Sequence, residues 1–391
     1  MTRARAAAGL SEHPLTTHAV GEAVGAVLDE LGPAPDLAAV FVTDAHAGAL
    51  DDVTAAVRAT LAPGVLIGAA STSVVGGHRE IEGRPAVVVW AARLGPVEPV
   101  RVRAERQADG WAVTGVPTTA MEPGRTLVLL ADPFTFPAEP FVDQLGDRAP
   151  GLAVVGGLTS GAEGAGGMRL ALDGAIHAHG AVGALLPADA DIATVVSQGC
   201  RPIGDPLVVT RAERNLILEL GGRPALDVLR DVLVAMSPEE REVASRGLQV
   251  GWVIDEHRDR FERGDFLVRS VLGVDSGTGG IAVGHRPEVG RTAQLHVRDA
   301  ATADDDLRHH LAGRRASGAL VFTCTGRGAG LFGVPDHDAD LISSALGTRA
   351  TAGMFAAGEL GPVGGRSFVH GFTASMLLVA PRAASGGAAA G

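Results

Sequence analysis

The sequence contains no lysine and no tyrosine, and its only asparagine is Asn215. A Walker-type phosphate-binding loop, a pyridoxal enzyme and a protein kinase each need a lysine for phosphate binding or chemistry, so these classes are excluded. Every fixed positive charge is an arginine, whose planar guanidinium suits the bidentate binding of carboxylates.

Cysteine is also scarce, with only Cys200 and Cys324 in 391 residues. Two cysteines make no disulfide framework and fit a reducing compartment. No apolar run approaches the roughly 20 residues of a membrane span, and the N-terminus lacks the apolar core of a signal peptide. We therefore expect a cytoplasmic protein that does not associate with a membrane.

The formal net charge of -12 would repel a phosphate backbone, and no cluster of arginines offsets it locally. We therefore expect no nucleic-acid partner. The length of 391 residues exceeds what one hydrophobic core usually organises, so two domains are expected.

Alternating helical and strand patterns predict a mixed α/β fold. Residues 17–31 carry one apolar helical face, strand-like residues 39–45 follow, and a helical pattern at 50–61 leads to the strand-like PGVLIGAASTS. The pattern recurs over residues 126–161, again with a Pro-Gly pair before the last strand. We predict two domains of layered mixed β-sheets flanked by helices, with a duplicated β-α-β unit in the N-terminal domain.

The predicted domain boundaries follow changes in composition. Turn signals at Gly204 and Pro206 indicate a connector, and Pro224 is suited to the first position of the next helix. The expected parts are an N-terminal tail (1–16), an N-terminal domain (17–199), a connector (200–219), a C-terminal domain (220–381) and a flexible tail (382–391).

Three segments near the C-terminus together resemble the FIST C domain: ALVFTCTGRGAGLFG, TAGMFAAGELGPVGG and SFVHGFTASMLLV. Upstream, GVLIGAASTS, LAVVGGLTSG and VVSQGCRPIGDPLVVT resemble the FIST N domain and its end. The resemblance extends over about residues 20–380, so the two predicted domains are FIST N-like and FIST C-like.

This resemblance implies a sensory module of signal transduction that binds small ligands such as amino acids. Modules of this family occur alone or joined to kinase, cyclase or chemoreceptor outputs. We expect no output domain within this chain, so a separate kinase or cyclase would be the partner that receives the signal.

Arg327 and Glu359 each lie in a glycine-flanked turn. The guanidinium of Arg327 could hold a ligand carboxylate through two parallel hydrogen bonds, and Glu359 could accept a ligand ammonium. Alternatively, the two residues pair permanently and belong to the scaffold. Both interpretations remain open from the sequence.

Cys324 and His370 raise a second alternative, a thiol-dependent hydrolase or transferase in which His370 acts as the base. A cysteine at the end of an apolar strand is more often a small buried side chain, so we favour binding without turnover. Thr373 follows His370 in the same segment, and the remaining candidates are the hydroxyl residues Ser71, Thr72 and Ser160.

Clustered ligand types at PDHDAD (335–340) and RHHLAG suggest a metal site only weakly. The first stretch is more simply the start of a helix with acidic caps, so we expect neither a metal nor a cofactor.

The expected ligand pocket lies near loops 68–73, 156–161, 324–330, 358–361 and 370–373. A third possibility is a scaffold that a partner recognises through an exposed apolar patch.

Overall fold

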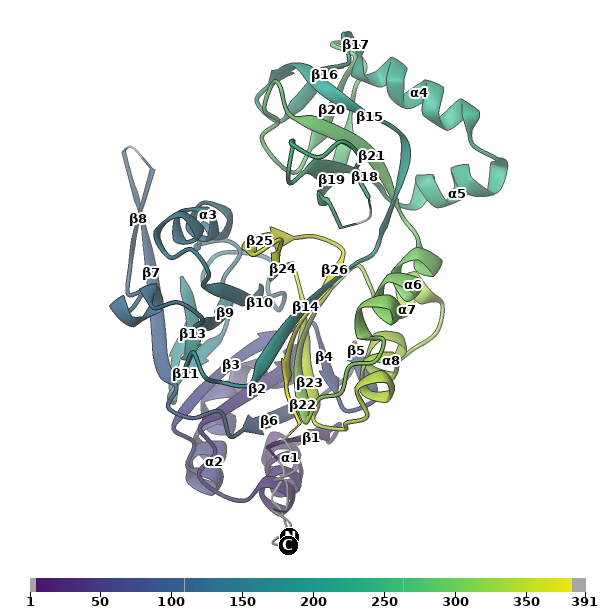
Figure 1. Cartoon of the computed structure of the whole chain (residues 1–391). Coiled ribbons are helices and arrows are strands. Elements are labelled where there is room, and N and C mark those ends of the chain that lie inside the picture. Colours follow the sequence, from purple (N-terminus) through teal and green to yellow (C-terminus); the bar gives the residue numbers. More distant parts are fainter. Residues whose placement is uncertain (1–4, 109, 263, 382–391) are drawn as a thin grey trace, which may run out of the picture. The chain divides into compact units, whose positions relative to one another are not determined.

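The computed structural model of the chain describes residues 5–108, 110–262 and 264–381 (Figure 1). The chain packs into two compact units. Unit 1 takes the described parts of Met1–Val196, His310–Val369 and Ser375–Gly391, and unit 2 consists of Ser197–His309 and His370–Ala374. The predicted mixed α/β fold with two domains is confirmed, although the units are not consecutive in sequence.

Unit 1 contains three repeats of a β-α-β motif, each with two parallel, hydrogen-bonded strands. The repeats are β2 (Leu37–Thr43), α2 (Leu50–Leu61) and β3 (Val65–Ser71); β9 (Thr126–Ala131), α3 (Ala138–Arg148) and β10 (Ala153–Leu158); and β22 (Gly318–Cys324), α8 (His337–Leu346) and β23 (Thr351–Ala356). The predicted duplication is confirmed, and the third repeat lies in the C-terminal part of the chain.

Each repeat continues into a hairpin that pairs with the sheet of another repeat. The hairpins are β4 (Ser73–Gly76) with β5 (Arg79–Glu82), β11 (Leu170–Leu172) with β12 (Ala175–His177), and β24 (Gly358–Val363) with β25 (Arg366–His370). Strand β4 pairs with β23, β24 pairs with β10, and β11 pairs with β3, all antiparallel. The exchange is cyclic, so each sheet contains strands from two repeats.

Each repeat ends with an antiparallel strand that returns to its own sheet. These strands are β6 (Val87–Ala92), β13 (Ala181–Leu186) and β26 (Thr373–Val379). Edge strands complete the three sheets: β1 (Ala6–Ser11), β7 (Glu98–Gln107) with β8 (Gly110–Thr114), and β14 (Ile192–Gln198).

A single apolar cluster joins the three sheets of unit 1. It includes Phe41, Leu130 and Phe322 from the three repeats, all fully buried. The rings of Phe41 and Phe322 meet edge to face with centroids 6.2 Å apart, a favoured aromatic geometry. Helices α1 (Thr16–Leu31) and α2 cover the first sheet through a second cluster, and α3 covers the second sheet through a third.

One glycine in each repeat allows close approach of the paired strands. Gly68, Gly156 and Gly353 occupy the second strand of their repeats. A Cβ atom at these positions would lie 2.8, 1.9 and 1.7 Å from the carbonyl oxygens of Val40, Leu129 and Val321, respectively, each the partner residue on the first strand. Any side chain would force the strands apart, which explains glycine inside these strands.

Unit 2 is a mainly antiparallel sheet that closes on itself. Its strands run in the order β15 (Cys200–Glu213), β21 (Thr292–Arg298), β18 (Leu248–Val253), β19 (Phe266–Asp275), β20 (Gly280–Val283), β16 (Leu216–Leu220) and β17 (Arg223–Pro224). An additional pairing of β15 with β16 closes the ring. Helices α4 (Ala225–Ala235) and α5 (Pro238–Arg246) follow β17, and α6 (Ala300–Leu311) follows β21.

Two segments expected to lack regular structure form strands. The expected tail 1–16 contains β1, whose small apolar residues pack in the core beside β6. The expected connector 200–219 forms β15 and most of β16, because a run of β-favouring residues follows Pro206. The expected flexible tail, 382–391, lies outside the described residues. No helix among the described residues is both long and apolar enough to cross a membrane.

We predict that Gly353→Ala destabilises the protein by about 3 kcal/mol, because the new methyl group would overlap the Val321 carbonyl oxygen. Gly25→Ala in α1 is the matched control, since a Cβ there meets nothing within 4 Å, and it should stabilise the helix by up to about 1 kcal/mol. Urea unfolding of both variants tests this. Equal stability of the two variants would contradict the close approach.

Candidate functional site

A pocket of 330 Å³ in unit 1 lies where loops of all three repeats meet. Its lining contains four hydroxyl residues, Thr72, Thr159, Ser160 and Thr325, with Pro133, Phe134, Ala162, Met168 and Ala357 as the apolar remainder. These residues follow the carboxyl ends of β3, β9, β10, β22 and β23. Three of the loops expected from the sequence, 68–73, 156–161 and 324–330, therefore contribute to one pocket.

A cluster of hydroxyls binds two of these loops to the third repeat. The Oγ atoms of Ser71 and Ser160 lie 2.8 Å apart, and each donates to the Phe355 carbonyl oxygen over 2.7 Å. Thr72 adds a backbone N–H that donates to Ser160 Oγ over 3.3 Å, and its own Oγ1 lies 3.2 Å from the same atom. The structure thus brings together the three hydroxyl residues that the sequence indicated.

The loop carrying Pro133 and Phe134 is held by Asp132, which is fully buried at the end of β9. Its carboxylate accepts the Phe134 N–H over 2.9 Å and the hydroxyl of Thr135. Thr135 Oγ1 in turn accepts the N–H of Gly180 over 2.9 Å. This local turn positions Phe134, which is 47% exposed, on the pocket wall. Asp132 was not among the predicted site residues, although an Asp-Pro pair after a strand is a turn signal.

Arg327 forms a buried, bidentate ion pair with Asp338. Its Nε lies 2.6 Å from Asp338 Oδ2 and its Nη2 lies 2.9 Å from Oδ1, and both side chains are fully buried. Arg327 precedes α7 (Ala329–Phe332), and Asp338 lies in the first turn of α8. The fork-to-fork geometry is the strongest pairing available to an arginine and a carboxylate.

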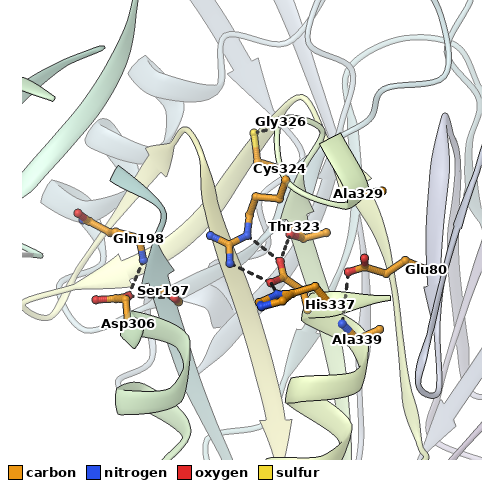
Figure 2. A network of polar contacts seen from close by, with 12 residues as sticks. Glu80, Ser197, Gln198, Asp306, Thr323, Cys324, Gly326, Ala329, His337 and Ala339 are labelled. Atoms are coloured by element: carbon orange, nitrogen blue, oxygen red, sulfur yellow. Dashed lines mark hydrogen bonds and ion pairs between the residues drawn. The ribbon is translucent and has the colours of Figure 1, made fainter. Parts of the chain in front are cut away.

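Two more side chains fix the Asp338 carboxylate, Thr323 from β22 and His337 from α8 (Figure 2). Thr323 Oγ1 donates to Oδ2 over 2.9 Å, and His337 Nδ1 lies 3.1 Å from Oδ1. The His337 ring stacks on Phe332 with centroids 3.5 Å apart. The Arg327 guanidinium lies over the same ring, 5.3 Å from its centroid.

Electrostatics keeps this pair charged. Burial alone raises the pKa of Asp338, but Arg327 and the hydrogen bonds from His337 and Thr323 outweigh it and hold the pKa well below its usual range. Burial likewise lowers the pKa of Arg327, and Asp338 more than compensates, so the net pKa is raised. Breaking the pair would be unfavourable, because removing either member would leave an uncompensated buried charge.

The bidentate partner of Arg327 is therefore Asp338, which the sequence pattern indicated only as part of an acidic helix start. That expected cap does not form: Asp336 stands before α8 with φ 64° and makes no side-chain cap bond. Its Oδ1 instead accepts the N–H of Glu80 over 2.7 Å. No group of three or more potential metal ligands occurs among the described residues.

The other candidates are buried. Glu359 in β24 is fully buried, and its charge helps to raise the pKa of Arg327. Cys324, 6% exposed, ends β22, and its Sγ accepts the N–H of Gly326 over 3.4 Å. His370 and Thr373 are buried and are grouped with unit 2. Their proposed roles in ligand binding stay predictions.

Glu80 in β5 is a buried carboxyl group close to the ion pair. Burial, reinforced by the charges of Asp338 and Glu82, raises its pKa from 4.5 to about 8. Its Oε1 accepts the Ala339 N–H over 3.3 Å, while its Oε2 is buried without a hydrogen-bond partner among the described residues. This raised pKa favours the neutral, protonated form of Glu80 at pH 7.

Comparison with known proteins places these features in a family. The FIST N domain model matches residues 36–223, and the FIST C domain model matches residues 225–362. The chain belongs to the FIST family. The boundary between the two family segments, at residues 223–225, lies inside unit 2, so the FIST N and FIST C segments do not coincide with the two packing units. The general role of FIST domains is the sensing of small ligands in signal transduction.

Relatives of nearly the same length occur in mycobacteria. An uncharacterised protein of Mycobacterium tuberculosis is 45% identical over 385 residues, which cover 96% of this chain and 99% of the relative. An uncharacterised protein of Mycobacterium bovis is 45% identical over 383 residues, covering 96% and 98%. The likeness to these relatives thus extends over both units.

We predict that Arg327→Ala and Asp338→Asn each lower the free energy of unfolding by about 3–5 kcal/mol, because each leaves an uncompensated buried partner. The double variant Arg327→Met, Asp338→Leu should recover part of this loss, since two apolar side chains replace the pair while Thr323 and His337 lose their acceptor. Urea titrations measure all three. A double variant as unstable as the summed single variants would contradict a mutually dependent pair.

A second prediction concerns pH. The folded-state pKa of Glu80 is raised, so its neutral form stabilises the fold at low pH, and that contribution is lost as pH rises from 4.5 through about 8. Glu80→Gln should therefore be more stable than the parent at pH 8 and lose less stability between pH 5 and pH 8. Glu105→Gln, at an exposed site, is the control. Parallel pH profiles for the parent and Glu80→Gln would disprove the assignment.

Proposed function

We propose that this FIST protein is a cytoplasmic sensor that binds an amino acid or similar small carboxylate in the unit 1 pocket without chemical turnover. The observation that supports it is the character of the pocket. None of the described residues that line it has an ionisable side chain, and four of them offer hydroxyls. A site that lacks a general base and an activated nucleophile favours binding over catalysis.

The carboxylate would be held by neutral donors. Thr72 and Thr325 are exposed, so their hydroxyl protons can point to a ligand, while Ser160 already donates to the Phe355 carbonyl oxygen. Hydroxyl and backbone N–H groups at the ends of strands form cradles that suit anions. The described residues of the lining include no carboxylate for a ligand ammonium, so the acidic end is the part that this pocket would recognise.

The rest of the ligand would contact the apolar wall. Phe134 and Met168 offer an aromatic ring and a flexible thioether, which together accept varied aliphatic groups. The volume of 330 Å³ is near the lower end of ligand pockets, which fits a molecule of amino-acid size.

Arg327 plays a different part from the one that a ligand-binding arginine would have. Its buried guanidinium is bound to Asp338, so it supports the loop that carries Thr325 rather than contacting the ligand.

Signal output is part of the same proposal: a separate kinase or cyclase would detect the ligand-bound state. A cytoplasmic location agrees with two cysteines that are both buried thiols.

We predict that a thermal-shift screen of amino acids and metabolic carboxylates finds a ligand that raises the melting temperature. Thr72→Val should lower the affinity for that ligand about tenfold, which is the usual effect of losing a hydrogen bond to a charged group. Thr114→Val, an exposed change on β8, is the control. The bound compound should be recovered unchanged by mass spectrometry.

Two results would reject this proposal. One is a ligand whose affinity Thr72→Val and Thr114→Val leave equally unaffected, which would place binding elsewhere. The other is conversion of the compound together with rapid alkylation of Cys324, which would favour the thiol-dependent enzyme.

A further inference from the structure

A larger cleft lies within unit 2, with a volume of 590 Å³. It lies between strands β15 and β21 and the helices α4 and α5. Its apolar lining includes Ile203, Leu207, Val228, Val232, Met236 and Leu295. Volumes of this size are typical of sites that enclose small organic molecules.

Helix α4 presents more apolar surface than the sheet covers. Ala225 and Leu229, on its first turns, are buried in the core of unit 2. Val232 and Ala235 lie further along the same face, but Val232 is only half-buried and Ala235 is exposed at the cleft. The last two turns of the helix therefore leave an apolar wall that a ligand could cover.

A β-bulge in β15 forms the opposite side. The pairing of β15 with β21 shifts between Ile203 and Leu207, so residues 204–206 leave the ladder. Gly204 has φ 63°, and a Cβ there would approach Val232 Cγ2 to 2.7 Å. Gln294 Nε2 fixes the bulge by donating to the Gly204 carbonyl oxygen over 2.6 Å. Bulges often redirect a side chain next to an active site. This bulge places Asp205 in the lining of the cleft.

The charges at the cleft leave an excess of negative charge. Arg223 is paired with Asp231 over 2.6 Å. Arg201 is paired with Asp299 over 3.0 Å and lies 3.8 Å from Glu240. Both arginines that line the cleft are therefore neutralised, whereas Asp205 has no ion pair among the described residues.

We propose that this cleft is a second ligand site, which binds a small organic amine. Its alkyl or aryl body would cover the wall formed by Val232 and Ala235, and its ammonium group would lie beside Asp205. The site goes beyond the proposed function, because it belongs to another unit and selects the opposite charge. An ammonium beside a carboxylate at the rim, with the apolar body inside, satisfies both parts of the lining.

Hexylamine, hexanoate and 1-hexanol test the proposal, because they share one apolar body and differ in charge. Isothermal titration of the full chain should show the order of affinity amine, alcohol, carboxylate. Asp205→Asn should weaken hexylamine about threefold to tenfold, leave 1-hexanol unchanged and reduce the dependence on salt.

Filling the cleft provides the steric test. Ala235→Phe places a ring in the cavity and should abolish hexylamine binding. Val234→Phe is the matched control, because Val234 is 76% exposed on the neighbouring side of α4 and does not line the cleft. If Ala235→Phe fails to fold, judged by its melting temperature without ligand, Val232→Phe replaces it. The proposal is overturned if hexylamine does not bind, if hexanoate binds as tightly, or if both phenylalanine variants have the same affinity.

Discussion

Hydrogen bonding between each hairpin and the sheet of another repeat is the constraint on which unit 1 depends. Strands β4, β11 and β24 complete sheets begun by other repeats, so no repeat can bury its strands alone. The turns that start this exchange follow β3, β10 and β23, and they bring Thr72, Ser160 and Ala357 to one pocket. Each lies four residues beyond the close-approach glycine of its strand. The pocket is thus a consequence of how the sheets are closed.

Buried ionisable side chains hold the loops and helices of unit 1 together. Asp338 links the loop after β22 to the start of α8 through Arg327, and Glu80 on the exchanged hairpin lies against the same helix. A paired ion couple and a neutral carboxyl group can both be buried at tolerable cost, which an unpaired charge cannot. The ionisable side chains therefore hold the loops in place and leave neutral groups to line the pocket.

The sequence predicted local features well and distant partners poorly. Apolar periodicity and the Pro-Gly pairs predicted the first two repeats. The third repeat was not predicted, because it lacks a Pro-Gly pair before its last strand and follows the long segment of unit 2. Ser71, Thr72 and Ser160 could be selected because hydroxyls after a buried strand are a local signal. Asp338 was missed because an aspartate in a first helical turn usually serves the helix. Hairpin exchange joins residues far apart in sequence, which no local pattern specifies.

The central claim is that Arg327 supports the site while the hydroxyl pocket binds the ligand. The most direct measurement is the affinity of the Arg327→Met, Asp338→Leu double variant for the carboxylate found with the parent protein, by isothermal titration. We predict affinity within about threefold of the parent, because in the proposed site neither residue contacts the ligand. A folded double variant that no longer binds would contradict the account.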